Sequence, residues 1–443
     1  MARLEKVTTS RDVLTREWIQ RAAERASARL SRDNVDLQRL RQRGFEAAAL
    51  DRDVVARHNR RYSLELPCGA IRNQEQSGRC WLFAPVVLAQ TAALHRGRIT
   101  ANEPFSETYL YFFNLVEQAR ATLADVRRIT ERQDSLSVDT LRRNLSGEVM
   151  GLGDGGEWEW AFALIEKYGL VPARCMPETA SSKRTKALAV DLHECFARAA
   201  RAINTTTNND DVVRDRALGD IVRILVAHLG CPPSVIKVRR RTLSPTEYAA
   251  DIVGFRPADW RVIISNPLLP FKRVYERRAS AITSHSPRFN LRRLNVSQRR
   301  LRHLVCASLE AGYAVGCSAD VERNDIDHRR GIMHPAVFNR SRVYGSQMIS
   351  DLPRREDIYL GIASSKHAMA IAGLDRSARG ATPNKYRVVN SWGPELGDQG
   401  VYHMYSEWFE ENVFKLAIHW SVLNDRERAA YGHPEPLPGG RFY

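Results

Sequence analysis

The sequence predicts an α+β protein in which a helical half precedes a β-rich half. Apolar residues recur at helical spacing through much of the first 180 residues. After about residue 311, short apolar runs separated by turn residues are typical of strands. Because the two patterns are segregated along the chain and do not alternate, the α+β class is favoured over a repeating strand-helix architecture.

The N-terminal part divides into two predicted regions. Residues 1–57 combine alternating charge with helical spacing and are expected to form an N-terminal helical arm. Residues 58–180 contain three predicted helices, of which the first begins at Cys80, the second runs from Ser106 to about Arg128, and the third from Glu157 to Tyr168. We therefore expect a helical body preceded by a separate arm.

The C-terminal part is predicted to be rich in strands. A helix from Val296 to Ala311 leads into residues 311–425, which carry strand-like runs at 314–317, 368–373, 386–390, 400–404 and 416–419. Residues 426–443 are rich in proline and glycine, a composition typical of an extended arm. The strand-rich region is thus expected to end in a C-terminal arm.

Composition limits the class of protein further. At 443 residues and 43% hydrophobic content, the chain can bury more than one core, and two or three structural units are expected. It has neither the roughly 18 to 20 uninterrupted apolar residues that span a bilayer nor the apolar N-terminal run of a signal peptide. Seven scattered cysteines form no Cys-x-x-Cys pair. Cytoplasmic residence is the simplest expectation.

No metal or other cofactor is expected. The twelve histidines include no His-Glu-x-x-His pattern. The run Gly151-x-Gly153-x-x-Gly156 fits a dinucleotide-binding fingerprint. However, the apolar run that precedes it is too short for a central strand. The chemistry must therefore come from side chains.

Cys80 has the surroundings of a nucleophilic thiol. Only the thiolate attacks a carbonyl well, so a base and a positive local field must accompany it. The apolar stretch from Trp81 onward predicts that Cys80 begins a buried helix, and Gly78 permits a sharp turn into that helix. The positive end of the helix dipole would then favour the thiolate over the thiol.

Candidate catalytic partners of the Cys80 thiol lie both close to it in the sequence and several hundred residues later. His367 could take and return the proton, and the amide of Asn390 could hold the imidazole in the right tautomer. Gln74, six residues before Cys80, could join the Cys80 backbone N–H in an oxyanion hole. A lone Cys in an apolar run or a lone His near small apolar residues is usually a core residue. Together, in the order Cys, His, Asn, these residues predict a cysteine peptidase.

At these residues the chain resembles the papain-like cysteine peptidases, and more closely their intracellular branch, bleomycin hydrolase and aminopeptidase C. The run Ser77 to Trp81, Ser-Gly-Arg-Cys-Trp, is the form of that branch, where secreted relatives usually carry a second cysteine. Further matches are Phe105-Ser106-Glu107-Thr108-Tyr109-Leu110, Gly153-Asp154-Gly155-Gly156-Glu157-Trp158, Lys167 to Pro172, and Met176-Pro177-Glu178-Thr179. The resemblance spans roughly residues 60–425 and implies a papain-like fold, in which a helical half faces a β-barrel-like half across a cleft.

Spacing supports the same branch. In simple papain-like enzymes the histidine follows the cysteine by about 130–150 residues, whereas here 367 − 80 = 287. We therefore expect a large insertion at residues 181–310, which is basic and has a largely helical pattern. By resemblance, this insertion is an oligomerisation region of a hexamer.

The resemblance also implies residues that bind substrate. Gly155 and Gly156 correspond to glycines of the cleft wall whose backbone pairs with an extended substrate. Trp392, two residues after Asn390, would cover the hydrogen bond between histidine and asparagine and exclude water. Peptides are therefore the expected substrates.

The C-terminus bears on the kind of peptidase. Relatives end in an arm that lies in the cleft, and its terminal carboxylate pairs with the α-ammonium of the substrate, a role that would fall here to Tyr443. Their terminal Trp-Asp-Pro-Met-Gly motif is missing from this chain. The resemblance implies an aminopeptidase that also cleaves bleomycin-like amides, while an endopeptidase or acyltransferase with the same triad is the alternative.

Net charge suggests a further partner. Lys and Arg exceed Asp and Glu by 16, with concentrations at 237–241, 272–278 and 288–303. Such a positive surface attracts polyanions, so nucleic acid is a candidate partner. A catalytically idle nucleic-acid-binding ring is a third alternative, disfavoured because the complete set Gln74, Cys80, His367 and Asn390 is present.

Overall fold

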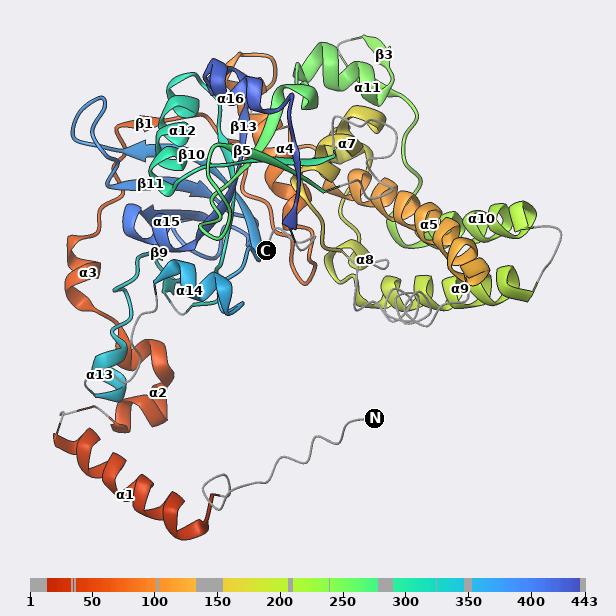
Figure 1. Cartoon of the computed structure of the whole chain (residues 1–443). Coiled ribbons are helices and arrows are strands. Elements are labelled where there is room, and N and C mark those ends of the chain that lie inside the picture. The colour runs from red at the N-terminus through yellow and green to blue at the C-terminus, as the bar shows by residue number, and fades with distance from the viewer. Residues whose placement is uncertain are drawn as a thin grey trace.

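The computed structural model describes residues 14–32, 35, 37–100, 103–132, 154–205, 210–238, 240–277, 290–323, 325–345 and 353–438. A helical part lies beside a large sheet, and the N-terminal helices extend away from both (Figure 1). Helices and strands thus occupy separate parts of the molecule, which confirms the predicted α+β class.

The helical part is built around one buried helix. α4 (Cys80–His95) is apolar on all sides, so it can be stable only when it is surrounded by protein. α5 (Glu107–Arg132) and α7 (Trp158–Tyr168) pack against it. Two further long helices, α9 (Lys186–Thr205) and α10 (Asp210–Leu229), pack against each other and against α5, and the short helix α8 (Ala180–Lys183) precedes them.

Twelve strands of the described residues form one sheet. Its order is β14-β5-β6-β4-β13-β7-β10-β11-β12-β9-β8, and β1 pairs with β10 outside this path. The strands are β1 (Leu64–Glu65), β4 (Trp260–Ile264), β5 (Arg273–Arg277), β6 (Leu291–Asn295), β7 (Val315–Ala319), β8 (Ile326–Asp327), β9 (Ile332–Met333), β10 (His367–Asp375), β11 (Lys385–Val389), β12 (Val401–Tyr405), β13 (Val413–His419) and β14 (Glu435–Pro436). A separate hairpin joins β2 (Ile236–Val238) to β3 (Arg241–Leu243).

Residues 181–310 were expected to be largely helical, and this prediction is wrong for the second half of that region. β4, β5 and β6 lie in the main sheet, where β4 pairs with β13. Arginines conceal the strand pattern, because Arg293 in β6 is fully buried and binds Glu157 at 2.8 Å and Glu159 at 2.7 Å. From sequence alone a charged residue is predicted to be exposed, because the distant partners that allow its burial are not known.

Shorter helices complete the molecule. α12 (Gln298–Glu310), which begins at the side-chain cap Ser297, covers β10 and β13. The others are α11 (Pro245–Glu247), α13 (Arg340–Tyr344), α14 (Arg354–Tyr359), α15 (Ser406–Asn412) and α16 (Asp425–Ala430), together with the π-helix η2 (Tyr248–Val253) and the 3-10 turns η1 (Ala173–Cys175), η3 (Pro257–Asp259) and η6 (Trp420–Val422).

The N-terminal segment forms three helices, α1 (Arg16–Arg32), α2 (Leu37–Ala49) and α3 (Arg52–Arg57). α2 packs on α13 in a small second core, in which the rings of Phe45 and Phe338 lie 6.0 Å apart. α1 extends beyond that core, and none of its residues is buried (Figure 1).

The main core brings two element ends together. α4 packs against β10, whose first residue is His367, while Cys80 is the first residue of α4. The interface between helical part and sheet therefore carries both residues at the ends of their elements. Among the described helices, none is both long and apolar enough to cross a membrane.

Candidate active site

Cys80 lies where the helical part meets the sheet. The backbone N–H groups of Ala368, Trp81 and Cys80 itself are directed at the sulfur, and each lowers the pKa of the thiol. Burial is the larger effect and raises that pKa above its ordinary value. Burial of the sulfur therefore opposes the effect that the start of α4 was expected to have on the thiol.

The imidazole of His367 is held by Asn390. His367 Nε2 lies 2.8 Å from Asn390 Oδ1, and the backbone N–H of Ser391 donates to the same oxygen at 2.8 Å. Because a backbone N–H can only donate, the accepting atom must be the amide oxygen, and His367 Nε2 must carry a hydrogen. Nδ1 is then the basic nitrogen of the neutral ring.

The surroundings of His367 keep it neutral. Burial lowers the pKa of His367 to about 4, the hydrogen bond with Asn390 opposes this shift, and the nearby His328 adds to it. A neutral imidazole can accept a proton near pH 7. The Cys80 sulfur accepts from the backbone N–H of Ala368, the residue that follows His367 in the chain.

Trp392 covers one face of the imidazole. Its ring stacks on His367 with centroids 4.6 Å apart and an interplanar angle of 20°. His328 and Tyr402 meet the same indole edge-on, at 5.2 and 5.3 Å between centroids. The indole thus restricts the imidazole to one plane and keeps water from that face.

Gln74 forms hydrogen bonds with the segment before α4 and with the segment after β11. Its Oε1 accepts from the Ser391 hydroxyl at 2.7 Å, and its Nε2 donates to the Ser77 carbonyl at 2.6 Å. Its backbone N–H donates to the Ser391 carbonyl at 2.8 Å. Since a carbonyl can only accept, the amide orientation is determined, and Nε2 keeps one further hydrogen for another acceptor.

The two glycines of the predicted cleft wall differ. A Cβ on Gly156 would lie 2.4 Å from the ring of Trp81, so close packing on that indole requires glycine there. A Cβ on Gly155 would meet nothing within 4 Å, and this residue is exposed. Tyr443, the other predicted substrate contact, lies outside the described residues.

Sequence reasoning missed several residues that hold this site. Ser391 binds Gln74 and Asn390, and His328 supports Trp392. Asp154 accepts from the Gly78 backbone N–H at 2.7 Å and, through its carbonyl, from the Trp81 indole N–H at 2.6 Å. Ser391 and Asp154 lie in or beside recognised motifs that assign them no partner, whereas His328 lies outside every recognised motif.

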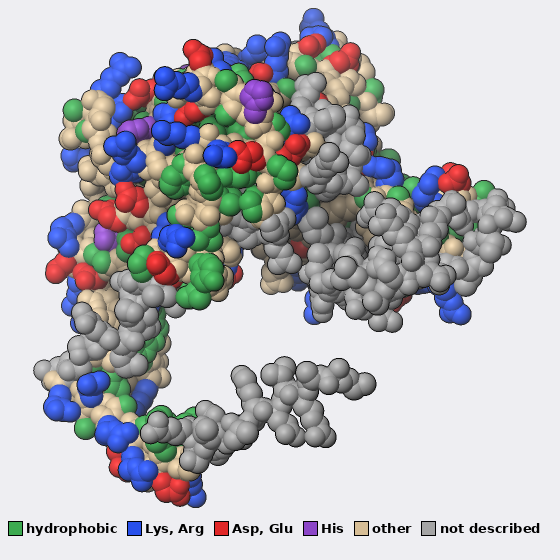
Figure 2. Space-filling model, in the orientation of Figure 1, with side chains coloured by type: hydrophobic (Ala, Val, Ile, Leu, Met, Phe, Trp, Pro, Cys, Tyr) green, Lys and Arg blue, Asp and Glu red, His purple; other side chains and the backbone are tan. Residues whose placement is uncertain are grey.

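The basic stretches carry less free charge than their composition suggests. Arg241, Arg273, Arg292, Arg300 and Arg302 each form an ion pair with a carboxylate of the same chain. Figure 2 shows Lys and Arg side chains scattered among Asp and Glu on this face, not gathered into one patch. Part of the positive charge is therefore neutralised by ion pairs within the chain.

A cysteine at a helix start, whose sulfur meets the backbone of the residue after a histidine that an asparagine amide holds, is the arrangement of a cysteine-type peptidase with a papain-like fold. The sequence profile of the peptidase C1-like family matches residues 14–438, and the chain belongs to this family. Both the predicted family and the predicted class of enzyme are thereby confirmed.

Curated relatives extend over most of the chain. Aminopeptidase E of Lactobacillus helveticus is 27% identical over 402 residues, which cover 87% of this chain and 88% of the relative. Aminopeptidase W of Lactobacillus delbrueckii subsp. lactis is 28% identical over 394 residues, which cover 85% and 87%. The solved structure of PepW from Lactobacillus rhamnosis HN001 has a TM-score of 0.83 at 23% identity and covers 96% of this chain and 97% of its own, which shows a shared fold.

Proposed function

We propose that this protein is a cysteine aminopeptidase that removes N-terminal residues from peptides, and from bleomycin-like amides, through a thioester intermediate. Several curated relatives that match along most of the chain are named aminopeptidases. The observation that carries the proposal is the bond from His367 Nε2 to Asn390 Oδ1, with the Cys80 sulfur at the neighbouring N–H of Ala368.

In the proposed acylation step, Nδ1 of His367 takes the thiol proton of Cys80 as the sulfur attacks the scissile carbonyl. The negatively charged oxygen that forms would accept hydrogen bonds from the Cys80 backbone N–H and from the remaining Nε2–H of Gln74. The carbon–nitrogen bond then breaks, and the imidazolium gives its proton to the leaving amine. A thioester between Cys80 and the N-terminal residue of the substrate remains.

In the proposed deacylation step, the neutral imidazole takes a proton from water, whose oxygen attacks the thioester carbonyl. The carbon–sulfur bond breaks, and the proton returns to the sulfur. Burial raises the pKa of Cys80 and lowers that of His367, and both shifts favour the neutral forms before substrate binds. Charge separation then coincides with attack, when thiolate and imidazolium stabilise one another at short range.

A stoichiometric thiol alkylator tests the nucleophile. We expect one equivalent to abolish hydrolysis by the wild type, and Cys80→Ser to be inactive and to lose the reactive site. Cys231, which is exposed, offers the matched control, since Cys231→Ser should behave like the wild type. Peptide hydrolysis by Cys80→Ser at more than about one-hundredth of the wild-type rate would contradict the proposal.

The choice between exopeptidase and endopeptidase rests on the C-terminal arm. β14 pairs with β5, and the backbone N–H of Leu437 donates to the Glu276 carbonyl at 3.0 Å, so the chain is attached to the sheet up to this point. We propose that the segment beyond it carries the Tyr443 carboxylate to the α-ammonium of the substrate. Removal of residues 439–443 should then abolish the preference for free over acetylated N-termini. An unchanged preference would exclude the arm, and internal cleavage of blocked peptides by the wild type would favour the endopeptidase.

The exposed N-terminal helix supports a proposal of self-association. Trp18 and Ile19 are 50% and 53% exposed on α1, which buries none of its residues. A single amphipathic helix is marginal in water unless its apolar face is covered. We therefore propose that α1 packs on further copies of the chain, up to the hexamer that the resemblance implies. Sedimentation should show this assembly, and Trp18→Ser with Ile19→Ser should weaken it. A monomeric wild type at micromolar concentration would contradict the idea.

Cytoplasmic residence is proposed on the state of the thiols. All seven cysteines are unpaired, including the buried Cys317 and the exposed Cys231. Free thiols persist in reducing compartments. Fractionation of cells that produce the protein tests this, and recovery with a secreted fraction would contradict it.

A further inference from the structure

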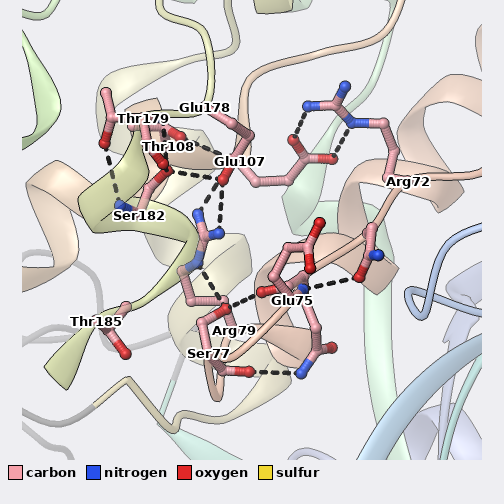
Figure 3. Close-up of polar contacts among 12 residues, drawn as sticks. Arg72, Glu75, Ser77, Arg79, Glu107, Thr108, Glu178, Thr179, Ser182 and Thr185 are labelled. Atoms are coloured by element: carbon pink, nitrogen blue, oxygen red, sulfur yellow. Dashed lines mark hydrogen bonds and ion pairs between the residues drawn. The ribbon is translucent and has the colours of Figure 1, made fainter.

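Three recognised motifs converge on the residue before the nucleophile (Figure 3). Arg79 is 0% exposed, and its two terminal nitrogens donate to the carboxylate oxygens of Glu178 at 3.1 and 2.7 Å. The hydroxyls of Thr108 and Ser182 donate to the same carboxylate at 2.7 and 2.8 Å. The motifs around 77–81, 105–110 and 176–179 thus form one network.

The charges of this network are balanced. Beside the pair Arg79–Glu178, Arg72 donates to both oxygens of the buried Glu107, at 3.3 and 2.9 Å (Figure 3). Burial opposes ionisation of Glu178, but the bonds from Arg79, Thr108 and Ser182 lower its pKa below the ordinary value. A buried pair that keeps every charge paired tolerates desolvation, whereas loss of one partner is costly.

The ion pair is linked to the oxyanion hole by Ser77. Arg79 Nε donates to Ser77 Oγ at 3.0 Å, and this hydroxyl donates to the Gln74 carbonyl at 2.6 Å. The Ser77 carbonyl in turn accepts from Gln74 Nε2 at 2.6 Å. Ser77 therefore contacts both the backbone and the side chain of the candidate oxyanion donor, and Arg79 holds Ser77.

The same chain of bonds continues to the imidazole. Gln74 Oε1 accepts from the Ser391 hydroxyl, and the Ser391 backbone N–H donates to Asn390 Oδ1, which also accepts from His367. A displacement at Ser77 is thus transmitted first to Gln74, which is one bond away, and only later to His367.

We propose that Arg79 and Glu178 are positioning residues for the oxyanion hole: their ion pair holds Ser77, and Ser77 directs the free Nε2–H of Gln74 into the cleft. This inference rests on the proposed peptidase function. The planar guanidinium is needed because its Nε reaches Ser77 while both terminal nitrogens reach Glu178. A lysine ammonium keeps the charge but cannot make this three-point contact.

Positioning and plain stabilisation predict different kinetics. If the pair only stabilises the fold, each correctly folded molecule keeps the wild-type kcat. If it positions Gln74, molecules whose Cys80 still reacts with an alkylator lose kcat with little change in KM, because the oxyanion hole acts mainly on the transition state. Rates are therefore to be expressed per titrated active site.

The experiment compares Arg79→Lys, Arg79→Met and Ser77→Ala with the control Arg300→Met. Arg300 also makes a bidentate pair, with Glu427 at 2.7 and 2.7 Å, but it joins α12 to α16. We expect kcat per site to fall roughly tenfold in Arg79→Lys and Ser77→Ala and up to roughly 100-fold in Arg79→Met, with KM within about threefold. The affinity for a peptide aldehyde, whose hemithioacetal oxygen occupies the oxyanion hole, should fall in parallel.

Arg300→Met should lower the melting temperature but leave kcat per site unchanged. Wild-type kcat per site in Arg79→Lys and Ser77→Ala would overturn the inference even if Arg79→Met fails to fold. Loss of kcat without loss of aldehyde affinity would overturn it as well. Absence of peptide hydrolysis by the wild type would instead refute the proposed function, and the inference with it.

Discussion

Replacement of Gln74 by alanine tests the oxyanion hole directly. Gln74 is 8% exposed, and its side chain makes two hydrogen bonds, to the Ser77 carbonyl at 2.6 Å and from the Ser391 hydroxyl at 2.7 Å. Each bond contributes about 1 kcal/mol to folding, so the free energy of unfolding should fall by roughly 2 kcal/mol. Loss of one oxyanion donor should lower kcat by about 10²- to 10³-fold, or about 2.7–4 kcal/mol of transition-state stabilisation.

The assay measures kcat and KM on a fluorogenic aminoacyl amide, per alkylator-titrated site. Gln74→Glu keeps the size of the side chain but cannot donate to the oxyanion, so it should be at least as slow as Gln74→Ala. Gln76→Ala is the matched control, because Gln76 is the same residue type two positions later and is exposed. A kcat of Gln74→Ala within about threefold of the wild type would refute the assignment.

Three further predictions concern the supports of the site. Gly156→Ala should destabilise the protein by about 1–3 kcal/mol, since the new methyl would overlap the Trp81 ring, whereas Gly155→Ala should be neutral; equal midpoints in urea would contradict this. Asn390→Ala should lower kcat by roughly 10- to 100-fold although Cys80 still reacts with an alkylator, because His367 loses the acceptor that orients it. An unchanged kcat would contradict a role of Asn390 in the site. Burial lowers the pKa of His367 to about 4, so below pH 6.5 the unfolded chain binds a proton that the folded protein excludes. The free energy of unfolding should then fall by up to about 3 kcal/mol from pH 7 to pH 4, and His367→Ala should lose part of this dependence; a pH-independent stability would be inconsistent with the buried imidazole.

Part of the site could be predicted because its chemistry depends on residue type and order. A thiol at the start of an apolar helix, a later histidine and an asparagine form a set that chance seldom places in that order. The helix at Cys80 and the strand at His367 were also predictable, since continuous apolar runs mark both. What the pattern could not provide was the protonation state, because the pKa values of Cys80 and His367 depend on how deeply each is buried.

Other elements could not be predicted, because charged residues are buried there. The strands β5 and β6 contain several arginines, and their sequences do not resemble strands of a core. Arg293 becomes a core residue only when Glu157 and Glu159, more than 130 positions earlier, are folded against it. Local hydrophobic periodicity contains no information on such a pairing.

The amino-acid sequence by itself determined the family, the α+β class and the candidate residues Cys80, His367, Asn390 and Gln74. Only the tertiary structure decided that Arg79 pairs with Glu178, 99 positions away, and that Ser77 connects this pair to Gln74. The physical reason is that reactivity resides in individual side chains, whereas hydrogen bonds between distant segments exist only after packing has set their distances and removed competing water.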